Sequence, residues 1–192
     1  HGSVVFNGDG YSDDWQVEAA ARGLKNLRTT IDALPELDTP ETKALFAKYG
    51  VLNDRELASR YEVYLEQYEL SVSVEARSVL EVATTIVLPA AMRYQSELAA
   101  TAANLTAVGI EADTTILGAV TSAISELVAA TAALGAALSH EHEGSTYDGA
   151  AHAGASFLPA MDEVRAAADT RETLVADDLW PLPTYQEMLF IL

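Results

Sequence analysis

Apolar residues recur at steps of three and four along most of the chain, the spacing typical of α-helices. From Asp54 to Gly109 no strong stop signal interrupts this pattern, which predicts one very long helix. Asn53 is its expected N-cap, with Glu56 completing a capping box, and Pro89 is expected to kink it rather than end it. Its expected inner face comprises Leu57, Tyr61, Tyr64, Tyr68, Val72, Ala76, Val79, Ala83, Ile86 and Ala90.

Two further long helices are predicted after Gly109. The second begins near Asp113, its expected cap, and ends near Ser139; its apolar stripe is heptad-like. The third is expected from about Tyr147 to Val175, with a kink at Pro159. The inner face is predicted to contain Leu117, Val120, Ile124, Leu127, Thr131, Leu134 and Leu138 in the second helix, and Phe157, Met161, Val164, Ala168 and Val175 in the third.

Short capped helices are predicted before the long ones. Ser12 reads as the N-cap of a helix that stops at Gly23. Residues 26–37 form a connector with about one helical turn. Thr39 caps a helix that begins at Pro40 and ends before Gly50. No clear period-two alternation typical of strands follows.

The fold class predicted is therefore all-α: a long antiparallel three-helix bundle with short N-terminal helices and a C-terminal Trp/Pro-rich tail. The second and third helices are each about half as long as the first, so we expect them to pair with its C-terminal half. The N-terminal helices and the tail would then cover its N-terminal half. The expected divisions are a tag remnant (1–3), an N-terminal loop with short helices (4–52), the bundle (53–176) and a tail packing on the bundle or a partner (177–192).

Composition narrows the classes of partner. The 29 acidic and 11 basic residues give a formal net charge of -18, and such a surface repels phosphate backbones and anionic lipids. We therefore expect no nucleic-acid partner and no membrane partner. The chain has no cysteine, which excludes disulfides, thiol nucleophiles and thiolate metal sites. The absence of cysteine also fits a cytoplasmic protein, and no signal peptide is visible. The native stretch is expected to begin at Val4 or Val5 without an initiator Met, which suggests an excised fragment.

One segment is long enough to cross a membrane. Residues 116–139 carry a single charge, Glu126. Alanine, threonine, serine and glycine dominate the segment and drive membrane insertion weakly, and a central Glu opposes insertion by roughly a few kcal/mol. The sequence favours a bundle helix over a transmembrane helix.

The N-terminal loop offers two candidate ligand sites. Asn7, Asp9 and Glu18 have the spacing of positions one, three and twelve of an EF-hand, but Tyr11 and Ser12 occupy the fifth position and the turn-glycine position. The same loop could cradle a phosphate through the backbone around its two glycines. No lysine follows it, however, and the neighbouring aspartates repel anions. A glycine turn leading into a capped helix is the expected structure.

The best metal-like cluster lies in residues 140–152. It contains His140, Glu141, His142, Glu143 and His152. On one helix, His140 and His142 would point about 200° apart and could not share an ion, whereas in a loop they could. A solvated turn at a helix end is the expected structure.

The tyrosines at positions 61, 64 and 68 share one helical face, and they are expected in the bundle core with their hydroxyls at the rim. The nearby carboxylates Glu62, Glu66 and Glu69 are expected on solvated faces. No G-x-S-x-G turn or comparable nucleophile motif occurs. The residues alone thus predict no catalytic, no cofactor-binding and no metal-ligating residue, as in a scaffold or interaction domain.

Ten blocks of sequence spread along nearly the whole chain carry a family pattern. They are residues 4–12 with Trp15, 22–27, 29–30, 32–35, 48–52, 60–68, 88–91, 93–95, 178–185 and 187–190. These blocks resemble, in order, the C-terminal region of type III glutamine synthetases. The segment from about 99 to 155 is alanine-rich and offers little support.

The resemblance implies a parent that is a glutamate–ammonia ligase of nitrogen metabolism, making glutamine from glutamate, ammonia and ATP through a γ-glutamyl phosphate. It implies Mg and ATP in the parent, and a cytoplasmic double-ring homo-oligomer, commonly a dodecamer. The family's catalytic elements lie upstream of this region. Residues 7–10 only partly match the family's Asn-Gly-Ser-Gly loop, and Ser12 stands where a His is expected, so no catalytic residue is carried over.

The implied role is a structural domain that packs on the catalytic domain and on neighbouring subunits, and the apolar tail from Trp180 to Leu192 is one expected contact. Two alternatives remain open. One is a free-standing helical interaction module without catalytic activity. The other is a small metal-binding bundle that uses His140, His142 and His152.

Overall fold

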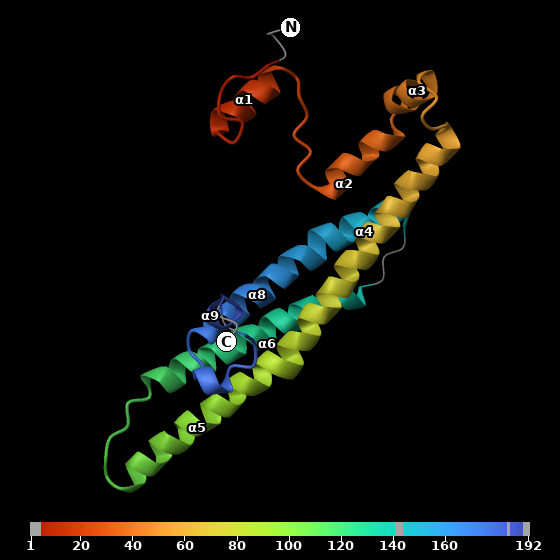
Figure 1. Cartoon of the computed structure of the whole chain (residues 1–192). Helices are drawn as coiled ribbons and strands as arrows, with labels where there is room; N and C mark the ends of the chain where they lie inside the picture. The colour runs from red at the N-terminus through yellow and green to blue at the C-terminus, as the bar shows by residue number, and fades with distance from the viewer. Residues whose placement is uncertain (1–4, 141–143, 184, 190–192) are drawn as a thin grey trace. The chain divides into compact units, whose positions relative to one another are not determined.

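The computed structural model describes residues 5–140, 144–183 and 185–189. Regular structure in these residues is helical, without strands, which confirms the predicted fold class (Figure 1). The elements in chain order are α1 (Asp13–Ala21), α2 (Thr30–Ala33), the 3-10 helix η2 (Leu34–Asp38), α3 (Pro40–Lys48), α4 (Asp54–Val82), the π-helical turn η3 (Ala83–Val87), α5 (Leu88–Ala107), α6 (Thr115–Ser139), α7 (Thr146–His152), the π-helical turn η4 (Ala153–Phe157), α8 (Leu158–Glu172), the 3-10 turn η5 (Asp177–Leu179) and α9 (Tyr185–Leu189).

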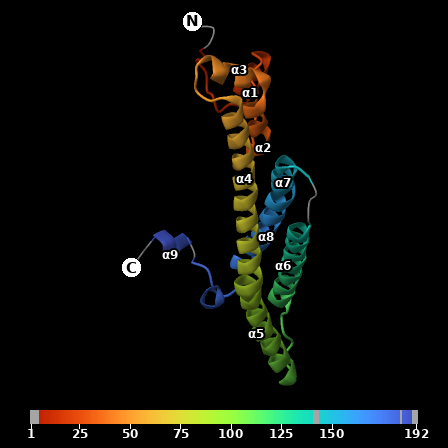
Figure 2. The ribbon, with the colours of Figure 1, turned by 90° about the vertical axis from the view of Figure 1, so that its right-hand side faces the viewer.

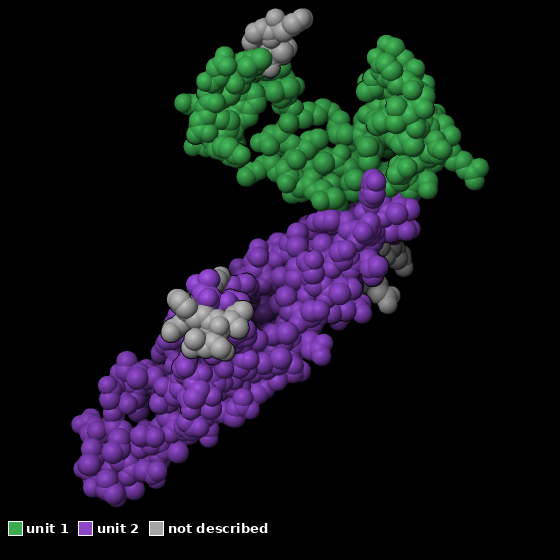
Figure 3. Space-filling view, viewed as in Figure 1, with its two compact units in different colours: residues 1–61 green, residues 62–192 purple. Residues whose placement is uncertain are grey.

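The chain divides into two compact units, residues 1–61 (unit 1) and residues 62–192 (unit 2), which are coloured separately in Figure 3. In unit 1 the predicted helix ends are confirmed. Ser12 accepts the backbone N–H of Trp15 at 3.4 Å, and Thr39 accepts that of Thr42 at 3.3 Å. Gly23 ends the first helix with a φ of 76°, a left-handed conformation that other residues adopt at a cost.

The start of the long helix also follows the prediction. The backbone N–H of Glu56 donates to the side chain of Asn53 at 3.0 Å, and the carboxylate of Glu56 accepts the backbone N–H of Asn53 at 2.8 Å. These reciprocal bonds form the expected capping box. At the start of α6, Asp113 accepts the Thr115 hydroxyl at 2.6 Å and its backbone N–H at 2.9 Å. The two hydrogen bonds lower the pKa of Asp113.

Unit 2 is an antiparallel bundle of three helical segments, in which α6 packs on both α5 and α8 (Figures 1 and 2). The predicted stripe of α6 faces inward, because Val120, Leu127, Thr131 and Leu134 are buried. By length and composition α6 could cross a membrane, but its buried residues pack inside the bundle, as predicted. The core cluster comprises Val72, Ala76, Ala83, Val87, Leu127, Leu134, Ala153, Phe157, Met161, Val164 and Ala167.

A π-helical turn precedes each proline at which a kink was expected. Pro89 has no N–H to donate to the carbonyl four residues back, and its ring would clash with that carbonyl. In the wide turn before it, the N–H of Leu88 donates to the carbonyl of Ala83, five residues back. The turn changes the phase of the inner face, so Val87 is buried and Ile86 is exposed. The prediction that Ile86 faces the core is therefore wrong.

The segment after α8 folds back onto the bundle. The turn η5 packs on α5, and Trp180 and Leu182 are half-buried against the core cluster. The tail was expected to cover the N-terminal half of the long helix, but α5 is its C-terminal half, so this part of the prediction is wrong. The helical periodicity of the long helix does not reveal such a contact, because it depends on the direction of the chain after α8.

Candidate functional site

Two histidines meet at the corner between α6 and α7. His140 caps the C-terminus of α6 and His152 ends α7, and their ring centroids lie 5.1 Å apart. The Nδ1 of His152 lies 3.2 Å from the Ser156 hydroxyl. Both rings line a pocket of about 370 Å³ with Glu69 and Arg77. This pocket brings together more titratable side chains than the other described hollows.

The candidate metal cluster at this corner lies partly outside the described residues. His142, with Glu141 and Glu143, lies outside the described residues. Within the described ranges, no three His, Cys, Asp or Glu side chains are grouped so that they could hold a metal ion. The expectation that this segment has no metal ligand stays a prediction, and so does its alternative, a site using His140, His142 and His152.

The N-terminal loop is a turn leading into α1. A side-chain oxygen of Asp9 accepts the backbone N–H of Tyr11 at 2.9 Å, and its carbonyl accepts the Ser12 hydroxyl at 2.7 Å. Glu18 instead forms an ion pair with Arg22 at 2.7 Å, one turn along the helix. The candidate calcium ligands Asp9 and Glu18 are thus engaged in separate local contacts, while Asn7 is exposed.

The tyrosine stripe of α4 is not uniformly in the core. Tyr68 packs against the core cluster, but Tyr64 is exposed and the neighbouring Leu65 is fully buried instead. The prediction for Tyr64 is wrong because the inner face of α4 passes through Leu57, Leu65 and Val72. Glu62 and Glu66 are exposed as expected, whereas Glu69 is half-buried and lines the histidine pocket.

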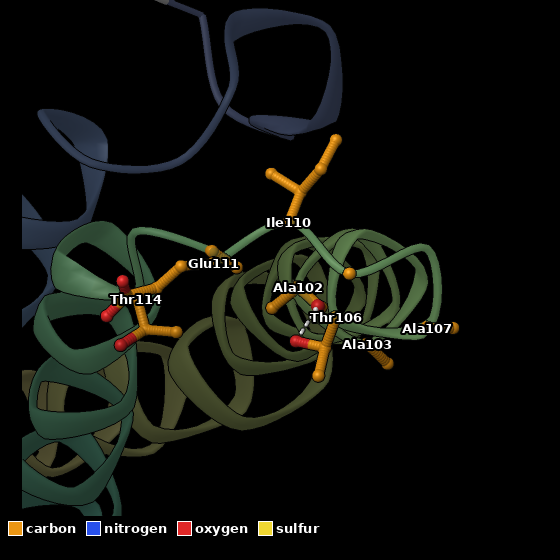
Figure 4. Close-up of a pocket in the computed structure, with 9 residues that line it drawn as sticks. Ala102, Ala103, Thr106, Ala107, Ile110, Glu111 and Thr114 are labelled. Carbon is orange, nitrogen blue, oxygen red and sulfur yellow. Dashed lines mark hydrogen bonds between the residues drawn. The ribbon is translucent and has the colours of Figure 1, made fainter.

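The largest described hollow lies at the turn between α5 and α6 and has a volume of about 840 Å³ (Figure 4). Small side chains such as Ala102 and Ala103 line it, and the Thr106 hydroxyl donates to the carbonyl of Ala102 at 2.9 Å. Glu111 is its one ionisable residue. The lining therefore offers neither a nucleophile–base pair nor a set of cationic groups for phosphate.

Arg171 on α8 is a buried cation that the sequence analysis missed. It is 1% exposed. Its Nη1 donates to the carbonyl of Ala167, while its Nε and Nη2 have no hydrogen-bond partner among the described residues. Burial lowers the pKa of Arg171, and the negative charge of Glu126 opposes this effect. Its position was visible in the sequence, because it continues the inward stripe of Val164 and Ala168 at helical spacing.

Comparison with known proteins shows the family of this chain. The family described as "Glutamine synthetase C-terminal domain" matches residues 1–106. The chain belongs to this glutamine synthetase C-terminal domain family. The match includes all of unit 1 and the long helix almost to its end, and most of the alanine-rich segment lies outside it.

Several longer relatives align with this C-terminal domain. The type-3 glutamine synthetase of Dictyostelium discoideum is 34% identical over 201 residues, covering 100% of this chain and 27% of the relative. The glutamine synthetase of Butyrivibrio fibrisolvens is 32% identical, with 100% and 28% covered. That of Bacteroides fragilis is 30% identical, with 97% and 27% covered. The chain thus spans little more than a quarter of the length of these relatives, and the matches give no support to a free-standing interaction module.

Proposed function

We propose that this chain is the non-catalytic assembly domain of a type 3 glutamine synthetase. The observation that carries the proposal is that the whole chain aligns with glutamine synthetases but covers little more than a quarter of their length. In the complete enzyme, glutamate, ammonia and ATP give glutamine, ADP and phosphate, with Mg and ATP held by residues outside this chain. The complete enzyme is a cytoplasmic homo-oligomer, a dodecamer, in which this domain contacts the catalytic domain and neighbouring subunits.

The catalytic part of this proposal is tested by ADP release from the purified chain, supplied with glutamate, ammonia, ATP and Mg. We expect no release above background, from a sample whose far-UV circular dichroism is that of a helical protein. The complete enzyme, assayed in parallel, is the positive control. Turnover that depends on both glutamate and ammonia would mean that catalytic groups lie within this chain, and would overturn the proposal.

The assembly role is tested at the end of the chain. Met188 and Leu189 on α9 are exposed, while Trp180 and Leu182 pack on the bundle. Removing residues 184–192 from the complete enzyme therefore leaves the tail's contacts with the bundle in place and removes an apolar segment suited to an interface. We expect a smaller assembly by sedimentation velocity. An unchanged assembly size together with unchanged activity would count against a role for this segment.

A further inference from the structure

Unit 1 consists of well-capped helices that enclose almost no core. The elements α1, α2, η2 and α3 contain no buried residue. Among residues 5–61 the structure buries only Leu57, on α4. Helices of four to nine residues are marginal in water, and most helical stability in proteins comes from packing an apolar face. Local hydrogen bonds therefore define these helices, but packing within the described part of unit 1 contributes little to hold them.

Many large apolar side chains of unit 1, the unit drawn green in Figure 3, are exposed. Val17 on α1 is 72% exposed and Leu45 on α3 is 55% exposed. Single exposed apolar residues are ordinary on soluble proteins, but within residues 5–61 eight large apolar residues are exposed, the others are half-buried, and only Leu57 is buried. The other exposed large apolar residues of unit 1 are Val5, Tyr11, Leu24, Leu27, Tyr49 and Val51.

A hollow runs alongside α1 within the same unit. It has a volume of about 480 Å³, and Tyr11, Trp15 and Leu24 line it with the basic residues Lys25 and Arg28. The ring of Trp15 also contacts that of Phe6, with their centroids 4.4 Å apart. Aromatic and arginine side chains surrounding a hollow are the composition enriched at protein interfaces.

The two units differ strongly in net charge. Residues 1–61 hold seven of the 11 basic and ten of the 29 acidic residues, a net charge of -3. Residues 62–192 hold the remaining four basic and 19 acidic residues, a net charge of -15, and the two values add to -18. A surface close to neutral can approach another protein domain with little repulsion, whereas the acidic bundle repels any acidic neighbour.

We infer that the exposed apolar surface of unit 1 is the face on which this domain docks to the rest of its own enzyme, that is, the part of the polypeptide outside the residues aligned here. This inference rests on the proposed function. The relatives carry nearly three quarters of their length outside the aligned region, so a large partner is covalently attached. Attachment raises the effective concentration of such a partner, which favours it over a separate molecule.

The test uses the complete enzyme with single substitutions in helices. Val17→Glu on α1 and Leu45→Glu on α3 place a charge on the proposed face. Leu70→Glu is the matched control, because Leu70 is 65% exposed on α4 in unit 2. Glutamate is a good helix former, so none of the three substitutions removes a helix by itself. Hydrogen exchange of the amides in residues 13–48 is measured by mass spectrometry, alongside assembly size and activity.

We expect these amides to exchange at least about tenfold more slowly in the complete enzyme than in the 192-residue chain. We expect Val17→Glu and Leu45→Glu to abolish most of that protection and Leu70→Glu to leave it intact.

Two outcomes would overturn the inference. If only Leu70→Glu removes the protection of residues 13–48 in the complete enzyme, the bundle is the docking face, while the proposed function stands. Equal protection of residues 13–48 in the isolated chain would also overturn it. Concentration-dependent sedimentation of that chain would then identify a second copy as the occupant, and monomeric sedimentation would identify its own bundle. Failure of the proposed function is seen separately, as ADP release by the isolated chain.

Discussion

Replacing Leu127 with alanine is expected to lower the free energy of unfolding of the bundle by about 2–5 kcal/mol. Leu127 is 0% exposed and belongs to the core cluster shared by α4, α6 and α8. The substitution removes buried methyl and methylene groups, and the favourable free energy of transferring them from water into the core is lost. It also leaves a cavity that three packed helices close only in part.

The measurement is urea unfolding at pH 7 in a Trp15→Phe background. Trp180 is then the one remaining tryptophan, and its fluorescence reports on the bundle against which it packs. Val128→Ala is the control, because Val128 is the next residue on α6 and is 48% exposed. We expect the control to lose less than about 1 kcal/mol. Equal losses for the two variants would contradict the assigned inner face of α6.

Replacing Arg171 with methionine is expected to stabilise the bundle, by about 1–4 kcal/mol at most. Burial strips the guanidinium of water, and among the described residues it makes one hydrogen bond, which its Nη1 donates to the carbonyl of Ala167. Glu126 attracts it but is itself exposed and bonded to Ser122 at 3.4 Å. Methionine fills a similar volume without a charge to desolvate, and it adapts to irregular spaces.

The matched control for this substitution is Arg165→Met on the same helix. Arg165 pairs with Asp169 at 2.7 Å, and its side chain is 70% exposed; exposed pairs contribute little, so we expect a change within about 0.5 kcal/mol. The same urea experiment checks both variants. A loss of stability in Arg171→Met would mean that the attraction of Glu126 and the bond to Ala167 outweigh desolvation. Burial lowers the pKa of Arg171, and methionine avoids this desolvation of a charged group.

The local signals in the sequence were sufficient to predict most helix boundaries. Capping side chains such as Ser12, Thr39 and Asn53 act on backbone groups within three residues, so their effect does not depend on the rest of the fold. The inner face of α6 was also predictable from the sequence. Its large apolar residues recur along one stripe of the helix, and that stripe is the one that is buried. These features need no knowledge of distant contacts.

The errors lie where distant contacts or an altered helical period decide the outcome. Ile86 was placed inside by extending a regular period through Ala83–Val87, where the helix has a wider turn. His140 and His152 were assigned to one candidate cluster from the sequence, but the contact between their rings depends on the geometry of the corner between α6 and α7. Arg171 was overlooked because arginine is rarely buried, although its spacing matched that of its apolar neighbours.

The π-helical turns bear on how chain length can vary in this family. The residues Ala83 to Ala90 and Ala153 to Ala160 share the order Ala, three variable residues, an apolar residue, then Leu-Pro-Ala. Each π-helical turn holds one residue more than a regular turn, because its hydrogen bonds join residues five apart instead of four. Deleting one residue from either turn would therefore restore a regular α-helix and leave the direction of the side chains after it nearly unchanged. Ala90 and Ala91, both fully buried at the start of α5, would then stay in the core. A deletion inside a regular helix would instead rotate all that follows by about 100°, so a one-residue gap between relatives is tolerated at these turns and not elsewhere in the same helices.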